Sequence, residues 1–284
     1  MIDSRSHAGG VCKLVFTDLD GSLLDHNSYS FEPARGQLRA LADAGVPVIP
    51  TTSKTRPEIE ALRDALGNAH PFIAENGAAI FVPEGYFDVQ PEGTRSTAGY
   101  WVREMVAGRA HWVALLDAIA ADYANDFEYF SRAGTAGIMA MTGLDEAAAA
   151  RANQRDYSEP VQWRGDADGL ARFIDELRAA GAAVNRGGRF LAVSGDCDKG
   201  RAVEWLASEY VAQWNCSRAD TLAIGDSDND RAMLEIADTA LLVRSPAHSF
   251  PSLVRDDGVL RSQAYGPAGW AEGVADWLAG RRTA

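Results

Sequence analysis

The chain has 284 residues, of which 46% are hydrophobic and 24% charged, and its formal net charge is −13. These values are typical of one large or two ordinary globular domains and exclude a disordered chain. The acidic balance, without a basic cluster, argues against a nucleic-acid partner, because phosphates are neutralised by Lys and Arg. No apolar run reaches the roughly 20 residues of a membrane span, so no membrane partner is predicted.

The beginning of the chain and its cysteines predict where the protein works. Residues 1–11 are polar and lack a hydrophobic signal core, so we expect a flexible leader. Cys12, Cys197 and Cys216 form an odd set without a C-x-x-C pair. This usage predicts reduced thiols in a cytoplasmic protein and no structural zinc site.

Strand and helix patterns alternate over the first part of the chain. The predicted elements are a strand at 13–20, a helix at 33–45, a strand at 46–53, a helix at 55–67 and a pair of strands over 71–82 that turn at Asn76-Gly77. The second helix carries Thr55 and Glu58 at capping-box spacing and stops at Gly67. Alternation with short links predicts right-handed βαβ units and a parallel sheet.

The pattern changes between about residues 83 and 194. The predicted elements there are an aromatic helix at 101–123, an alanine-rich helix at 145–153, and short strands at 127–134, 161–165 and 189–195. Trp101, Trp112 and Tyr123 are spaced as core positions of that first helix. The mixture predicts an α+β insertion rather than a continuation of the same sheet.

The alternation resumes in the last part of the chain. The predicted elements are a helix at 199–210, a strand that begins at 221 and ends in the polar residues 226–230, a helix at 231–238, a strand at 240–243 and a final helix at 268–280. We therefore expect an α/β fold, a Rossmann-like core with a parallel sheet and an inserted α/β (α+β) cap. The predicted core is 12–84 and 195–284, and the predicted cap is 85–194.

Polar side chains follow three predicted strands at the point where each strand ends. They are Asp18, Asp20, Thr52, Ser53, Asp226 and Asp230. Because ligands of parallel α/β sheets bind beyond the carboxyl ends of the strands, we expect these residues in one crevice. Each motif alone is equally typical of a helix cap or Asx turn, but three that converge favour chemistry.

The chemistry that suits this set is phosphoryl transfer. A carboxylate can attack phosphorus and carry an aspartyl-phosphate, while a second acid protonates the leaving oxygen and later activates water. Asp18 and Asp20 point the same way on an extended segment, and Gly21 permits the turn that exposes them. Oxygen ligands of this kind select Mg²⁺, which would bridge the carboxylates and an anionic phosphate. We expect Leu19 to face the core and Asp25 to be a turn residue outside the catalytic set.

Lysine is rare in this chain: of the 27 basic residues only Lys13, Lys54 and Lys199 are lysines. A lysine at the start of a helix is usually a solvated charge and is mildly disfavoured by the helix dipole. Since a guanidinium does not replace a compact ammonium at a tight site, we interpret Lys199 as an active-site residue.

The segments DLDGS, TTS, DKG and GDSDND stand in the order of the four signature motifs of haloacid dehalogenase superfamily phosphatases, which the chain resembles. The resemblance implies Asp18 as nucleophile, Asp20 as acid/base, Thr52 as a phosphate-binding hydroxyl and Lys199 as the cation beside them. It further implies that Mg²⁺ is bound by Asp18, the carbonyl of Asp20 and Asp226. Ser53, Gly21, Asn229 and Asp230 would bind phosphate or support the metal, and for Asn229 and Asp230 the alternative role is support of Lys199. The insertion resembles the cap of the Cof-like branch.

Further stretches, among them TTSKTRPEI, FIAENGAAIFVP, RDYSEPVQW and GGRFLAVSG, resemble mannosyl-3-phosphoglycerate phosphatases. This resemblance implies a small phosphorylated sugar-glycerate as substrate and mannosylglycerate, a compatible solute, as product. Such a substrate carries a carboxylate, which an arginine fork matches, and sugar hydroxyls. The predicted substrate contacts are Lys54, Glu75, Asn76, Arg155, Glu159, Arg186 and Arg189. For each cap arginine the alternative is a surface ion pair.

Several functions stay open at this point. Close relatives would act on glucosyl-3-phosphoglycerate or on a broad set of sugar phosphates, and the same scaffold could serve a phosphosugar mutase. A non-enzymatic phosphosugar sensor is disfavoured, because a sensor needs no acid/base residue beside Asp18. Spacing predicts neither the sugar nor the oligomeric state.

Overall fold

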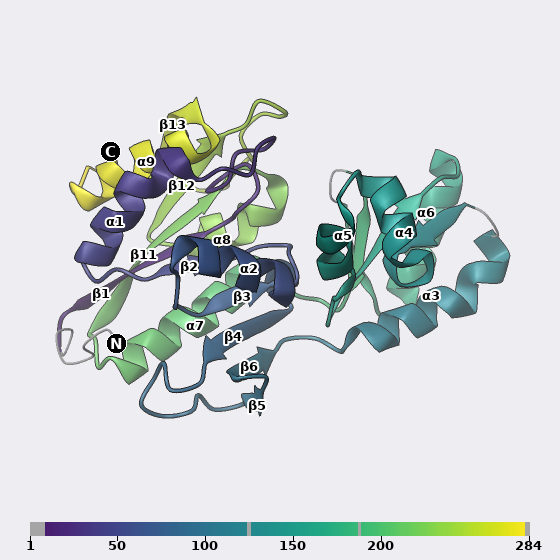
Figure 1. Ribbon diagram of the computed structural model, residues 1–284, viewed down its shortest axis with the longest axis horizontal. Helices are drawn as coiled ribbons and strands as arrows, with labels where there is room; N and C mark the ends of the chain where they lie inside the picture. Colours follow the sequence, from purple (N-terminus) through teal and green to yellow (C-terminus); the bar gives the residue numbers. More distant parts are fainter. Residues whose placement is uncertain (1–8, 124–125, 187–188, 282–284) are drawn as a thin grey trace. The chain divides into compact units, whose positions relative to one another are not determined.

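The structure is a computed structural model, and it describes residues 9–123, 126–186 and 189–281 (Figure 1). The chain divides into two compact units, each of which is described by itself below. The first contains Met1–Thr52, Asn68–Arg103 and Asp198–Ala284, and the second contains Ser53–Gly67 and Glu104–Cys197. None of the described helices is long and apolar enough to cross a lipid bilayer.

A five-stranded parallel sheet is the centre of the first unit. Its order is β13-β12-β11-β1-β2, from the strands β1 (Val11–Thr17), β2 (Val48–Pro50), β11 (Arg218–Gly225), β12 (Thr239–Arg244) and β13 (Val259–Tyr265). The middle strands are apolar and buried along most of their length, as expected where helices cover both faces of a parallel sheet. The predicted Rossmann-like sheet is therefore confirmed.

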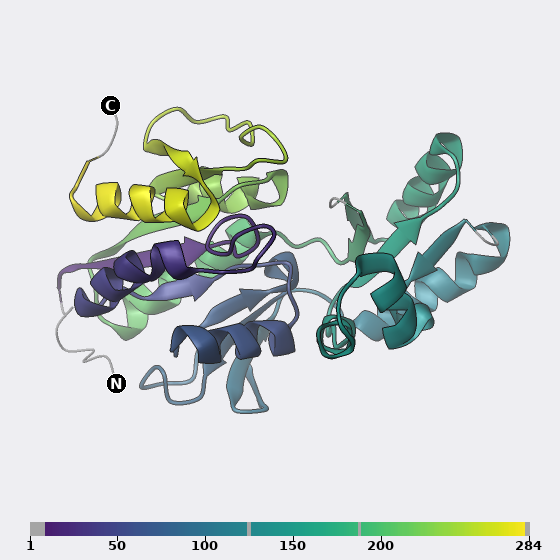
Figure 2. The same ribbon diagram turned by 45° about the horizontal axis from the view of Figure 1, so that its top comes forward.

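Helices and a small second sheet complete this unit. The helices are α1 (Arg35–Asp43), α7 (Lys199–Gln213), α8 (Arg231–Ile236) and α9 (Gly266–Leu278), and the short 3₁₀ turns are η2 (Glu32–Ala34), η3 (Glu75–Gly77) and η4 (Asp228–Asp230). Figure 2 shows α1 and α9 side by side, and α9 buries Trp270 and Trp277. The second sheet has the order β3-β4-β6-β5, from β3 (Phe72–Ala74), β4 (Ala79–Pro83), β5 (Arg95–Thr97) and β6 (Tyr100–Glu104).

The second unit is an α+β layer of helices on an antiparallel sheet of order β7-β8-β10-β9. Its strands are β7 (Phe127–Tyr129), β8 (Glu159–Trp163), β9 (Ala183–Arg186) and β10 (Leu191–Ser194), and its helices are α2 (Arg56–Leu66), α3 (Arg109–Tyr123), α4 (Phe130–Thr142), α5 (Glu146–Asn153) and α6 (Ala167–Ala179). A core around Trp112, Phe127 and Phe173 joins α3, α6 and the sheet. The predicted capping box of Thr55 and Glu58 is present in α2.

Several predicted helices and strands are wrong in type or extent. The predicted helix at 101–123 begins only at Arg109, because Tyr100–Glu104 pairs as β6, so Trp101 is not a helix core residue. The predicted strand at 127–134 becomes helix α4 after Tyr129. Strands β5, β9 and β13 and helix α6 were not predicted. The chain division also differs from the expected one: residues 85–103 belong to the first unit, since β5 and β6 extend the sheet of β4, while 53–67 belong to the second.

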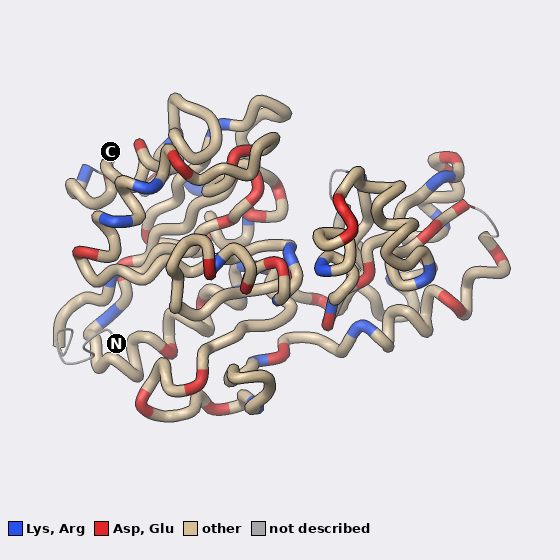
Figure 3. Tube along the Cα trace, viewed as in Figure 1, with Lys and Arg blue, Asp and Glu red and all other residues tan. Residues whose placement is uncertain are grey.

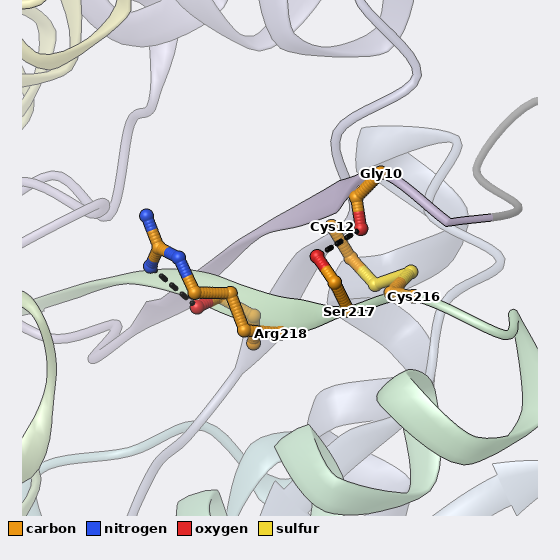
Figure 4. The surroundings of a disulfide bond; sticks show 6 residues. Gly10, Cys12, Cys216, Ser217 and Arg218 are labelled. Carbon is orange, nitrogen blue, oxygen red and sulfur yellow. Dashed lines mark hydrogen bonds between the residues drawn. A yellow bond between two sulfur atoms is a disulfide. The ribbon is translucent and has the colours of Figure 1, made fainter.

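A disulfide joins the starts of the two central strands of the first unit. Cys12 and Cys216 are bonded across a Cα–Cα distance of 5.9 Å and are 204 residues apart in sequence (Figure 4). Parallel pairing of β1 with β11 brings them together, and Ser217 donates to the carbonyl of Gly10 beside them. The prediction of reduced thiols is therefore wrong for this pair, whereas Cys197 is buried and takes no part in a disulfide.

We expect the disulfide to stabilise the first unit, because a cross-link over a long loop restricts the unfolded chain. Reduction, or the change Cys216→Ser, should lower the free energy of unfolding by about 2–4 kcal/mol. The measurement is urea denaturation with and without dithiothreitol. Cys197→Ser is the control and should respond to the reductant as the wild type does. Equal midpoints of the oxidised and reduced wild type would contradict this expectation.

Candidate active site

The carboxyl ends of β1, β2 and β11 meet at one edge of the main sheet. Thr17 is in register with Ile224 of β11 and with Pro50 of β2. The amide of Asp18 donates to the carbonyl of Ile224 at 2.8 Å, and the amide of Thr51 donates to the carbonyl of Thr17 at 2.8 Å. The three polar strand ends are thus brought together by the parallel register of the sheet.

Lys199 is the centre of this edge. Its Nζ donates to Oδ1 of Asp18 at 2.7 Å and to Oδ1 of Asp230 at 2.6 Å, and its side chain is fully buried. The residue is the first of α7, where the carboxylate of Asp198 caps the helix by accepting from the amide of Arg201. Burial alone would lower the pKa of Lys199, but the two carboxylates outweigh it and raise this pKa, so the ammonium stays charged.

Asp230 holds the lysine and the loop before it. Its Oδ2 accepts from the amides of Asp226 and Ser227 at 3.0 and 3.1 Å, while its Oδ1 accepts from Lys199. The carboxylate is therefore occupied on both oxygens by donors of the protein. Of the two supporting roles suggested by the sequence, this geometry favours support of Lys199.

Negative charge exceeds positive charge at this edge. Asp18, Asp226 and Asp230 are buried and offer carboxylate oxygens within 4.8 Å of one another. Burial, and then repulsion by Asp230, raise the pKa of Asp18 well above its usual range and that of Asp226 to about 6. A second basic side chain also lies here: Nε2 of His248 is 3.4 Å from Oδ2 of Asp226. Figure 3 shows Lys and Arg scattered along both units, so an anion must be held by local cations.

The residues present fit a magnesium ion. Carboxylate and carbonyl oxygens are its preferred ligands, and the raised pKa values mark a site that gains from a cation. A Cβ on Gly21 (φ +83°) would lie 2.6 Å from Oδ2 of Asp226, so only glycine lets the DLDG backbone approach this carboxylate. Asp18, the carbonyl of Asp20 and Asp226 would hold the ion, which would neutralise phosphate charge and polarise the phosphoryl oxygens.

The loop after Asp18 has the conformation expected from its sequence. The amide of Gly21 donates to the carbonyl of Leu24, and the amide of Leu24 donates to the carbonyl of Leu19. Leu19 is fully buried in the core, as predicted. Oδ1 of Asp25 accepts from the amides of Asn27 and Ser28 at 3.1 and 2.8 Å. Asp25 is therefore the Asx-turn residue that the sequence predicted.

The segment that follows β2 carries the candidate phosphate hydroxyl. Thr52 is buried. Its amide donates to the carbonyl of Ile73 at 3.1 Å, and its carbonyl accepts from the amide of Asn76 at 2.9 Å. In the second unit, Nη2 of Arg155 donates to the carbonyl of Ser53 at 2.7 Å, and its Nε donates to Ser158 at 3.0 Å. Arg155 thus fixes the segment between Thr52 and α2.

The other predicted substrate contacts of the second unit differ in burial and in their hydrogen-bond partners. Glu159 is fully buried and accepts from Arg109 at 2.5 Å and from the amide of Ser131 at 2.8 Å, a structural role that does not support contact with a sugar. Arg189 is exposed and donates to the carbonyls that end α4, Met141 and Thr142. Lys54 is partly buried. Gly187, Gly188 and the side chain of Arg186 lie outside the described residues.

Two residues near the carboxylates escaped the sequence interpretation. His248 lies in the loop after β12, outside every motif, and no spacing connects it with Asp226. Trp270 of α9 donates to the hydroxyl of Thr17 at 2.9 Å, directly before the DLDG segment. Only the tertiary fold brings these two side chains to the site.

A parallel α/β core with an inserted α+β unit, and a buried Asp–Lys–Asp cluster at the carboxyl ends of its strands, define a class of hydrolase. The model of the haloacid dehalogenase-like hydrolase family matches residues 15–90 and 161–248. The chain belongs to this family.

The chain is similar to individual members as well. It is 35% identical over 266 residues to the glucosyl-3-phosphoglycerate/mannosyl-3-phosphoglycerate phosphatase of Methanococcoides burtonii, covering 93% of this chain and 97% of the relative. These matches confirm the predicted class, a phosphoric monoester hydrolase.

Solved structures share the fold. A protein of Thermoplasma acidophilum matches 94% of this chain and 99% of its own with a TM-score of 0.66 at 17% identity. The sucrose-phosphatase of Synechocystis, solved with sucrose and phosphate, matches 94% of this chain and 98% of its own with a TM-score of 0.59 at 16% identity. Both support the core and cap architecture.

Charge repulsion at the site makes a prediction for the protein without metal. Because folding raises the pKa of Asp226 to about 6, its ionisation opposes folding; the penalty is absent below about pH 4 and complete above about pH 6, near 3 kcal/mol. In EDTA, Asp226→Asn should therefore be more stable than the wild type at pH 7.5 and similar at pH 4. Thermal denaturation measures this difference.

Mg²⁺ should raise the melting temperature of the wild type but not that of the Asp226→Asn variant. The matched control is Asp228→Asn, an exposed neighbour, which should follow the wild type at both pH values. A variant that is less stable than the wild type at pH 7.5 in EDTA would contradict the repulsion.

Proposed function

We propose that the protein is a Mg²⁺-dependent phosphatase that hydrolyses mannosyl-3-phosphoglycerate to mannosylglycerate and phosphate through an aspartyl-phosphate on Asp18. The observation that carries the proposal is the buried contact of Lys199 with Asp18 and Asp230. It orients a carboxylate at the end of a parallel strand, where ligands of this fold class bind.

The chain's own residues supply the steps. A carboxylate oxygen of Asp18 attacks phosphorus and displaces the sugar-glycerate oxygen, which takes its proton from Asp20. Asp20 then removes a proton from water, which attacks the phosphorus of the aspartyl-phosphate and regenerates Asp18. The Thr52 hydroxyl and the Lys199 ammonium hold phosphoryl oxygens throughout. Burial raises the pKa of Asp18, and the ammonium of Lys199 opposes this rise and favours the ionised nucleophile.

The choice of substrate rests on the relative of Methanococcoides burtonii, whose name includes both sugar-glycerate phosphates. Glucosyl-3-phosphoglycerate is therefore the second candidate, and a broad sugar-phosphate phosphatase or a mutase follows. Mannosylglycerate would make the protein an enzyme of compatible-solute synthesis. A cytoplasmic location stays a prediction, which the cysteines no longer support because two of them are bonded.

Asp18→Asn tests the mechanism. Without the nucleophile, turnover of phosphate esters should fall by at least about a thousandfold, while the fold is kept. Phosphate release and circular dichroism measure the two properties. Asp25→Asn is the control in the same loop, because asparagine also forms Asx turns, and it should stay active. An Asp18→Asn variant with near-normal turnover would exclude the aspartyl-phosphate.

Catalytic efficiencies test the substrate. We expect kcat/KM for mannosyl-3-phosphoglycerate to exceed that for small sugar phosphates by tenfold or more, since binding of the sugar and carboxylate adds to that of phosphate. Faster turnover of glucosyl-3-phosphoglycerate would make that compound, instead of the mannosyl one, the assigned substrate. A flat profile would identify a general sugar phosphatase, and a requirement for a bisphosphate activator would identify a mutase.

A further inference from the structure

The turn η3 of the first unit, Glu75–Gly77, has an unusual backbone. Its three residues are all left-handed, with φ values of +50° at Glu75, +61° at Asn76 and +93° at Gly77. Glycine adopts this region freely and asparagine tolerates it, but glutamate rarely does. A strained turn of this kind persists only where its surroundings hold it, and such turns cluster at functional sites.

Contacts with three separate segments hold this turn. The amide of Asn76 donates to the carbonyl of Thr52 at 2.9 Å, and Oδ1 of Asn76 accepts from Nδ2 of Asn229 at 3.2 Å. A Cβ on Gly77 would lie 2.5 Å from the carbonyl carbon of Asp198 and 3.0 Å from the amide nitrogen of Lys199. The turn therefore touches the phosphate-hydroxyl segment, the start of the lysine helix and the loop after β11.

The contact with Asn229 fixes the orientation of an otherwise exposed amide. Ser227 donates to Oδ1 of Asn229 at 2.5 Å, and Nδ2 of Asn229 points to Asn76. Both ends of the amide group are thus defined, one by its own loop and one by Asn76. Asn76 is half-buried. Asparagine tolerates the left-handed backbone of this position, and its side-chain oxygen accepts the hydrogen bond from Asn229.

We propose that Asn76 is a positioning residue that holds Asn229 of the loop after β11 in place beside the Thr52 segment for phosphoryl transfer, instead of making the direct substrate contact that the sequence predicted. The inference deepens the proposed phosphatase function and rests on it. It assigns to the Glu-Asn-Gly turn the task of joining three catalytic segments that are far apart in the sequence.

Asn76→Gly is the decisive variant. Glycine keeps the left-handed backbone and the hydrogen bond from the amide of residue 76 to the carbonyl of Thr52, while the side-chain hydrogen bond to Asn229 is lost. With Mg²⁺ we expect kcat to fall about tenfold or more on both the sugar-glycerate ester and p-nitrophenyl phosphate, with KM for the sugar ester within about twofold. The melting temperature should stay close to that of the wild type. Asn215→Gly is the matched control, a left-handed and exposed asparagine of the same unit, and should keep its kcat.

Two outcomes would overturn the proposal. An Asn76→Gly variant with normal kcat would show that the bond to Asn229 has no catalytic weight. A rise in KM for the sugar ester alone, with unchanged turnover of p-nitrophenyl phosphate, would restore the direct contact with substrate.

A double variant tests whether Asn76 acts through Asn229. If it does, the Asn76→Gly/Asn229→Ala protein should be no slower than Asn229→Ala, whereas losses that multiply would contradict the coupling. A readout without turnover separates this inference from the proposed function. Inorganic phosphate, titrated by calorimetry with Mg²⁺ present, should bind several-fold more weakly to Asn76→Gly than to the wild type or Asn215→Gly. Unchanged phosphate affinity would overturn the inference, and a wild type that binds phosphate but cleaves no ester would overturn only the function.

Discussion

The buried ammonium of Lys199 is the constraint on which the first unit depends. Burial of a charged lysine away from water costs free energy unless the ammonium is paired and hydrogen-bonded. Here Asp18 and Asp230 are its partners. The cost of separating them ties β1, α7 and the loop after β11 to one geometry, because each would otherwise leave a charge unpaired. Close backbone approaches serve the same end: a Cβ on Gly200 of α7 would lie 2.8 Å from the carbonyl of Ala232.

The same pairing leaves the site short of positive charge. One lysine cannot balance three buried carboxylates, and the raised pKa values of Asp18 and Asp226 express this imbalance. A site built in this way is incomplete alone and gains stability from a cation and from partners that the cation attracts. An anionic ester would therefore be attracted by a bound cation together with Lys199, in a protein whose formal net charge of −13 would otherwise repel it.

Local patterns and the order of strands and helices were predictable from the sequence, whereas individual side-chain contacts between distant segments mostly were not. Capping and turn signals predicted α2 and the turn of Asp25, because each depends on neighbours within a few residues. The alternation of strands and helices predicted the parallel sheet, and with it the meeting of the strand ends. The disulfide depends on the register of β1 with β11, and the place of His248 depends on a loop without a motif. Strand β6 was mistaken for helix because its pairing with β5, rather than its local pattern, decides its conformation.

The motif R-x-x-S-E-P shows how a resemblance can rest on residues that hold a unit together. Arg155 bonds to Ser158 and to the carbonyl of Ser53, Tyr157 bonds to Glu104, and Glu159 pairs with Arg109. Arg109 in turn donates to Asn153 at the end of α5, so the motif organises the second unit from within. Loss of either partner of the largely buried pair Arg109 and Glu159 would leave the other charge unpaired, so the two residues depend on each other. The motif therefore organises the second unit through contacts within the chain.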